Sequence, residues 1–141
     1  MRLLPMIAAA IAMMVIGFLW YSPLLFANPW MRAMGYDPND KEKLKEMQKG
    51  AGPLYASAFV ASVISAFALH VFAHQMQITT APAGLQLGLW CWAGFVATVQ
   101  FTDAIFGKRG RTLLIINSGY QLVSYLAMGA IIGGWNPAEH M

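Results

Sequence analysis

Residues 3–26 read LLPMIAAAIAMMVIGFLWYSPLLF, a run that contains no charged residue. A helix needs about 20 predominantly apolar residues to cross a membrane, and this run meets that requirement. Residues 54–76, 85–106 and 112–134 form three further runs that meet it too. We therefore predict an all-α, polytopic membrane protein with four transmembrane helices in an up-down bundle.

The overall composition points the same way. Of the 141 residues, 58% are hydrophobic and 11% are charged, whereas soluble domains are about a quarter charged. The length suits a single domain, residues 1–141. A net charge of +3 would suggest nucleic acid as a partner of a soluble protein, but here the basic residues flank apolar runs. We therefore expect the lipid bilayer as partner and no nucleic acid.

Basic residues are distributed unevenly among the segments that connect the runs. Five lie in loop 27–53 and three between the last two runs, while the segment between the second and third runs has none. Because Lys and Arg mark the cytoplasmic side, we expect loop 27–53 in the cytoplasm and both termini outside. Within this loop, Asp37 and Gly50 can begin and end a short helix at the cytoplasmic surface.

Polar residues inside the runs gather near the cytoplasmic level. The third and fourth runs form a hairpin, so Asp103 should share the depth of Asn117. By the same count, Gln100 should share the depth of Tyr120 and Gln121. The first run ends on this side as well. These positions predict one intramembrane polar cluster with the following members: Trp20, Tyr21, Ser22, Pro23, Gln100, Asp103, Asn117 and Gln121.

Two interpretations of this cluster stay open. In the structural one, Asp103 is partly hydrated near the interface, and hydrogen bonds to neighbours such as Asn117 hold the hairpin together. In the functional one, the carboxylate and amides line a cytoplasm-facing cavity for a proton, a cation or a polar solute, because intramembrane acids usually mark such sites. We favour the structural interpretation, since a position near the interface weakens the second one.

Small residues recur at every fourth position in three of the runs. They are Ser57, Ala61 and Ser65; Gly84 and Gly88; and Gly129 and Gly133. Such rows let helix backbones approach closely. We expect them to pack within the bundle, and a homo-oligomer interface is the alternative.

Two histidines, His70 and His74, stand four residues apart near the outer end of the second run. This spacing can present two imidazoles to one metal ion, with Glu139 and His140 on the same side. Histidines at a membrane boundary are more often hydrogen-bonding residues, so the pair is a weak metal candidate and we expect no cofactor. The sequence also lacks a short motif that joins a nucleophile with a base, and we expect no enzyme activity.

Two stretches carry a resemblance to a known family: GFLWYSPLLFANPWMRAMGY (residues 17–36) and INSGYQLVSYLAMGAIIGGW (residues 116–135). They resemble the small bacterial membrane proteins grouped as domain of unknown function 1761 (DUF1761). In that family the first helix ends in Trp-aromatic-Ser-Pro-Leu-Leu-Phe, followed by Trp-Met, and the last helix ends in small residues. The resemblance covers nearly the whole chain and implies a four-helix domain in the bacterial inner membrane. It implies no activity.

Function is not determined by the sequence. We expect a small membrane protein without catalytic chemistry of its own, which acts through packing, lipid contact or a protein partner. The alternative is an oligomeric transporter or channel subunit for a proton, a cation or a small solute. Asp103 would be its ionisable site.

Overall fold

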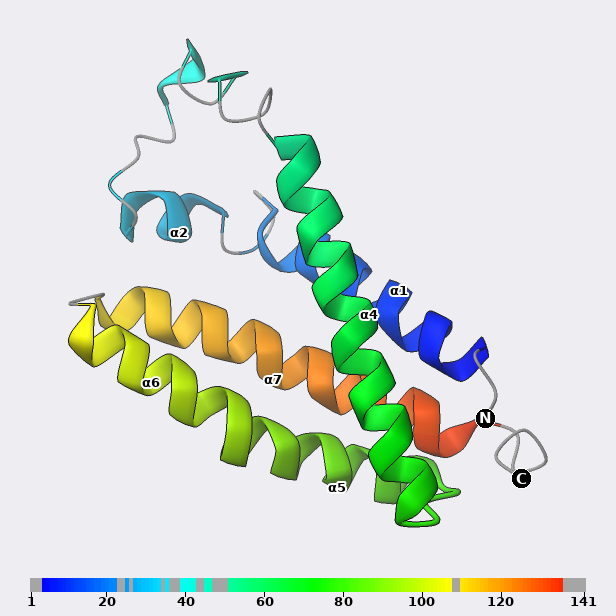
Figure 1. Ribbon diagram of the computed structural model, residues 1–141. Helices are drawn as coiled ribbons and strands as arrows, with labels where there is room; N and C mark the ends of the chain where they lie inside the picture. The colour runs from blue at the N-terminus through cyan, green and yellow to red at the C-terminus, as the bar shows by residue number, and fades with distance from the viewer. Residues whose placement is uncertain are drawn as a thin grey trace.

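The computed structural model describes residues 4–22, 25, 27–33, 35, 39–42, 45–46, 51–107 and 110–135. Within these residues the regular secondary structure is helical, without strands, so the predicted all-α class is confirmed. Figure 1 shows the helices α1 (Leu4–Trp20), α2 (Ala27–Ala33), α4 (Ala51–Gln75), α5 (Ala81–Cys91), the π-helix η1 (Trp92–Val96), α6 (Ala97–Phe106) and α7 (Arg111–Gly134).

Among the residues that the structure describes, three helices are long and apolar enough to cross a membrane: Gly52–Gln75, Ala81–Phe106 and Arg111–Gly134. The second of them is one continuous rod made of α5, η1 and α6. α1 is a shorter apolar helix of 17 residues. At 1.5 Å per residue it is about 25 Å long, slightly less than a hydrocarbon core of about 30 Å.

α1 ends at Trp20, although the apolar run continues to residue 26. Pro23 lies outside the described residues, but a proline disfavours helical conformation in the residue before it. That residue, Ser22, closes the last turn by donating its N–H and its hydroxyl to the carbonyl of Leu19, at 3.2 and 2.7 Å. The surface helix expected within 37–50 lies largely outside the described residues.

The connection from α4 to α5 is short and follows standard capping chemistry. After α4, Gln77 adopts a positive φ of 55°, and the N–H of Ile78 donates to the carbonyl of Ala73 at 2.9 Å. This arrangement satisfies the last carbonyls of the helix. Thr80 then begins α5 by accepting the N–H of Ala83 at 3.3 Å, with proline in the first turn. The two helices therefore meet at a tight corner.

α7 lies at the centre of the arrangement. It packs against α5 on one side and α1 on the other, and α4 crosses both α1 and α7 (Figure 1). The end of α7 lies beside the α4–α5 connection, because Gly133 approaches the carbonyl of Thr80. α1 begins at this same end of the molecule, whereas α2 and the α6–α7 turn lie at the other end (Figure 1). α1, the α5–η1–α6 rod and α7 thus run between the same two ends of the molecule, and α4 crosses them (Figure 1).

The core lies where α1, α4, α5 and α7 meet, and small side chains make up much of it. Its buried members are Met6, Ala9, Ala10 and Met13 of α1; Ala66, Leu69 and Ala73 of α4; Leu87 and Cys91 of α5; and Met128 and Ile132 of α7. Small residues at such contacts let helix backbones come close together.

Glycines allow a close backbone contact between α5 and α7. A Cβ atom added at Gly84 would overlap the carbonyl oxygen of Gly129, and one added at Gly88 would overlap the carbonyl oxygen of Tyr125. The absence of side chains is what permits this approach. The two glycine rows therefore pack against each other within the chain. On α4, by contrast, Ser57 and Ala61 are exposed.

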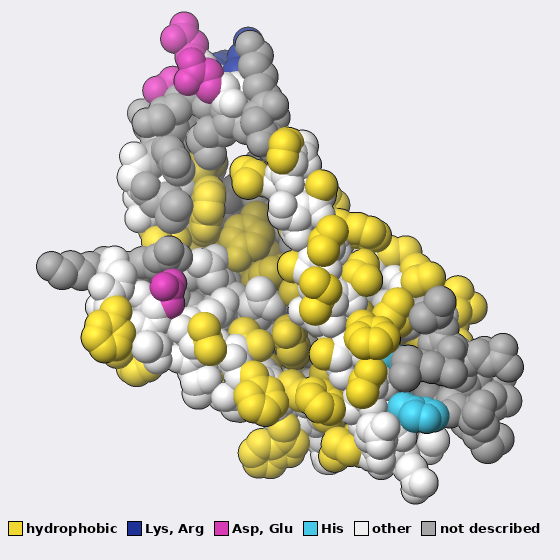
Figure 2. Space-filling model, viewed as in Figure 1, with side chains coloured by type: hydrophobic (Ala, Val, Ile, Leu, Met, Phe, Trp, Pro, Cys, Tyr) yellow, Lys and Arg dark blue, Asp and Glu magenta, His cyan; other side chains and the backbone are white. Residues whose placement is uncertain are grey.

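The outward faces of the helices are also apolar. α1 buries one side in the core and presents large hydrophobic residues on the other, at a helical spacing of three or four: Leu4, Ile7, Ile11, Val15 and Phe18. α4 likewise exposes Phe59, Val60, Ile64, Phe67 and Phe72. Figure 2 shows hydrophobic side chains spread over this face of the molecule. Helices that are hydrophobic all round belong to large cores or to membranes.

Candidate functional site

Hydrogen bonds from α1 reach the first half of α7. The indole N–H of Trp20 donates to the carbonyl of Ile116 at 2.9 Å. The hydroxyl of Tyr21 donates to Oδ1 of Asn117 at 2.6 Å. Trp20 is the last residue of α1 and Tyr21 follows it, and both acceptors lie within one turn of α7. They fix the end of α1 to α7.

The α5–η1–α6 rod bonds to the same part of α7 from the other side. The indole N–H of Trp92 donates to the carbonyl of Ser118 at 3.0 Å, and the hydroxyl of Ser118 donates to Oε1 of Gln100 at 2.8 Å. We refer to the six residues that supply these side-chain groups as the polar cluster: Trp20, Tyr21, Trp92, Gln100, Asn117 and Ser118.

Glycines and aromatic rings make the polar cluster geometrically possible. Gly119 leaves room for Trp20, whose ring carbon Cζ2 lies 3.0 Å from the place where a Cβ would stand. Tyr21 packs edge-on against Tyr120, with ring centroids 5.4 Å apart, and against Trp30 of α2 at 6.0 Å. Edge-to-face pairs at these distances are favourable. α2 is thereby held near the start of α7.

The π-helix η1 decides which residues of the rod face α7. The N–H of Ala97 donates to the carbonyl of Trp92, five residues earlier. This turn therefore holds one residue more than an α-turn. In an uninterrupted α-helix, the face of Gly88 would continue with Phe95 and Val99. These two are instead 67% and 65% exposed. Gln100 takes the inward position and reaches α7.

The predicted site residues are only partly brought together. Trp20, Tyr21, Gln100 and Asn117 belong to the polar cluster. Asp103 is exposed on α6, one residue before the buried Ala104. Ser22 bonds within its own turn, Gln121 is half-buried on α7, and Pro23 lies outside the described residues. The partner of Gln100 is Ser118 rather than a residue at the level of Gln121.

Two members of the polar cluster, Trp92 and Ser118, are missed by sequence reasoning. The signal for Trp92 is its indole N–H, which needs an acceptor wherever water is excluded. The signal for Ser118 is its position next to Asn117 in the middle of an apolar run. Neither signal identifies the partner, because the partner of Trp92 is a backbone carbonyl.

The sequence of the chain matches a known protein family. Residues 4–133 match the family described as Protein of unknown function (DUF1761). The chain belongs to this family. The match confirms the resemblance carried by residues 17–36 and 116–135. No curated protein and no solved structure matches the chain.

The two histidines of this DUF1761 chain have different surroundings. His70 is 2% exposed and lies inside the core, whereas His74 is exposed near the end of α4. The described part of the chain holds no group of three or more histidine, cysteine or acidic side chains that could share a metal ion. Glu139 and His140 lie outside that part. One imidazole is thus buried in the bundle, and the other lies on its surface.

Proposed function

We propose that the chain is a four-span protein of the bacterial inner membrane, a single up-down bundle with α1 as the first span. The 17 residues of α1 fall at the lower limit of spanning helices, about 17 to 25 residues. Its outward stripe from Leu4 to Phe18 is apolar, as lipid contact requires. Tyr21 and Trp30 follow it, and such aromatic residues favour the headgroup region.

The proposed orientation has loop 27–53 in the cytoplasm and both termini in the periplasm. Arg32 in the last turn of α2 and Arg111 at the start of α7 support it, because α2 and the start of α7 lie on the same side of the molecule (Figure 1). The α4–α5 connection at the opposite end carries no Lys or Arg. The positive-inside rule assigns the basic end to the cytoplasm.

We infer further that the protein has no catalytic chemistry of its own and acts through packing, lipid contact or a membrane partner. The polar cluster carries this inference. Its side chains bond to one another and to α7 carbonyls, so they serve as interhelical links. The surface that they hold in place is formed of large apolar residues, which suit lipid or another membrane protein.

Asp103 is the residue on which the transporter alternative depends. A proton or cation site inside a membrane protein faces the bundle interior or a water-filled cavity. Asp103 instead lies on the exposed side of α6, while Gln100 and Asn117 are engaged in other hydrogen bonds. This placement favours the structural interpretation of the carboxylate.

Proton flux into vesicles tests this choice. Purified protein would be reconstituted into vesicles that enclose a pH-sensitive dye, and a potassium diffusion potential would drive protons inward. We expect the flux through wild-type vesicles to equal that through protein-free vesicles, and Asp103→Asn to leave it unchanged. Glu46→Gln, which neutralises an exposed acid of the first loop, is the matched control. A wild-type flux that disappears in Asp103→Asn but persists in the control would establish the transporter alternative.

A further inference from the structure

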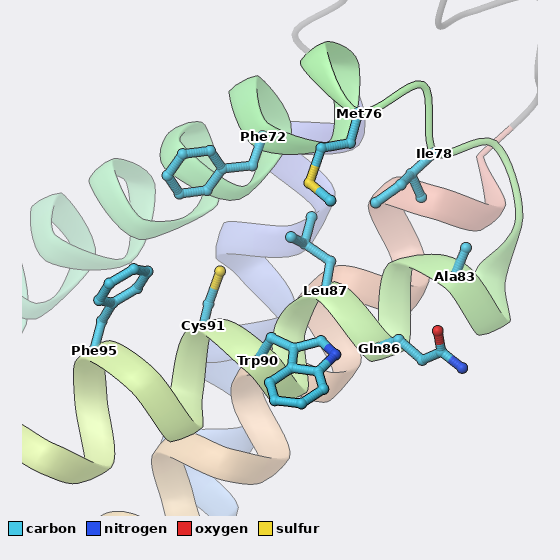
Figure 3. Close-up of a pocket in the computed structure, with 9 residues that line it drawn as sticks. All are labelled: Phe72, Met76, Ile78, Ala83, Gln86, Leu87, Trp90, Cys91 and Phe95. Atoms are coloured by element: carbon cyan, nitrogen blue, oxygen red, sulfur yellow. The ribbon is translucent and has the colours of Figure 1, made fainter.

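A groove of about 570 Å³ lies between the end of α4 and the α5–η1 helix. Figure 3 shows Phe72 and Met76 at the end of α4, on the side that faces α5. Leu87 and Cys91 line the groove from α5. The groove exists because the two helices meet at the tight corner and then diverge, α4 leaning away toward α1 (Figure 1). Its volume lies in the range of pockets that hold a small ligand, about 300 to 1,000 Å³.

The chemistry of the groove changes along its length. Its walls are almost entirely apolar, and Gln86 is its only lining side chain with an amide. Gln86 lies near the start of α5, at the end of the molecule that carries the exposed polar side chains of Gln75, Gln77 and Thr79. Phe95 lines the groove farther along the rod. The groove therefore has one polar end at the membrane surface and one apolar end within the membrane.

The length of the groove matches one leaflet of a bilayer. From Ala83 to Phe95 the helix rises about 18 Å at 1.5 Å per residue. Half of a hydrocarbon core of about 30 Å is about 15 Å. A single hydrocarbon chain entering from the surface would thus run the length of the groove and end beside Phe95.

We propose that this groove binds one acyl chain of a membrane phospholipid from the periplasmic leaflet, with the chain's ester group beside the Gln86 amide. The Gln86 side chain would donate to the ester carbonyl, while Leu87, Cys91 and Phe72 contact the methylenes. The proposal rests on the membrane location given above. It goes beyond general lipid contact, because the groove is continuous with the lipid-facing surface yet lined from two helices.

Photo-crosslinking separates a bound chain from ordinary surrounding lipid. The probe is a phosphatidylcholine with a diazirine in the middle of one acyl chain, added at increasing fractions to phosphatidylethanolamine vesicles that contain the protein. We expect adducts on the α5–η1 segment to saturate at low probe fraction, whereas adducts on the outward stripe of α1 rise in proportion to the probe. Adducts that rise in proportion on both segments would overturn the proposal.

Two matched variants locate the site. Ala83→Phe fills the groove near its polar end and should weaken probe binding about tenfold, the effect of roughly two methylene groups losing their burial. Ala61→Phe makes the same change on the exposed face of α4 and should leave the saturation curve unchanged. Equal curves for the two variants would contradict the site.

Adducts on the outward stripe of α1 also distinguish a failure of the groove proposal from a failure of the proposed membrane location. Adducts on that stripe without saturation at the groove would leave the membrane location standing and reject the groove alone. An absence of adducts on both segments would reject the membrane location itself. The α1 adducts further show that each variant is folded and inserted, since they should be the same in wild type and variants.

Discussion

Single hydrogen bonds from two indoles show how polar atoms are accommodated in a nearly charge-free helix bundle. Trp20 and Trp92 approach α7 from opposite sides and donate to carbonyls two residues apart, those of Ile116 and Ser118. A carbonyl in an α-helix has two lone pairs, of which the helix uses one. The second accepts the indole, so α7 binds both neighbours through its own backbone.

Removing the N–H of one of these indoles should lower the free energy of unfolding by about the contribution of one interhelical hydrogen bond. We expect Trp92→Phe to lower the free energy of unfolding in bicelles by about 0.6 to 1.7 kcal/mol, the average and the maximum for such bonds in a membrane bundle. Trp90→Phe is the matched control, because the neighbouring Trp90 is 73% exposed and should change stability by less than about 0.5 kcal/mol. Equal losses in the two variants would show that the hydrogen bond of Trp92 is not an interhelical link.

Between helices, the decisive feature is the contact of the α5 glycines with α7. Backbone meets backbone there without an intervening side chain, and this closeness brings the rod within reach of Ser118 farther along the hairpin. The row of glycines is visible in the sequence. The extra residue of η1 is not visible in the sequence. A π-turn persists through its tertiary contacts and leaves no distinct periodicity in the pattern of residues.

A methyl group at the glycine contact should force the two helices apart. Gly129→Ala places a Cβ against the carbonyl of Gly84, and overpacking of this kind costs about 1 to 3 kcal/mol. Gly52→Ala adds the same methyl group on α4, where no atom lies within 4 Å. Unfolding of both variants in the same bicelles measures the difference. A Gly129→Ala protein as stable as Gly52→Ala would mean that the helices do not pack this closely.

At the scale of the whole molecule, the apolar runs predicted the three long helices well. The segments 54–76, 85–106 and 112–134 overlap α4, the α5–α6 rod and α7. The end of α1 was predicted less well, because the apolar run continues past Trp20, where the helix ends. For the site, Trp20, Tyr21 and Asn117 could be predicted, because counting along the chain places them at the same depth in the membrane. The exposure of Asp103 could not, since it depends on the rotation that η1 imposes.

The central claim is that four helices cross the membrane, with the basic loop on one side and both termini on the other. Its most direct test is cysteine accessibility in intact cells, in a Cys91→Ala background that removes the native thiol. A membrane-impermeant maleimide should label a cysteine added ahead of Met1 and one at Thr79→Cys, while Lys45→Cys should react only after permeabilisation. Should the N-terminal cysteine instead behave like Lys45→Cys, α1 would not cross the membrane and the four-span account would be wrong.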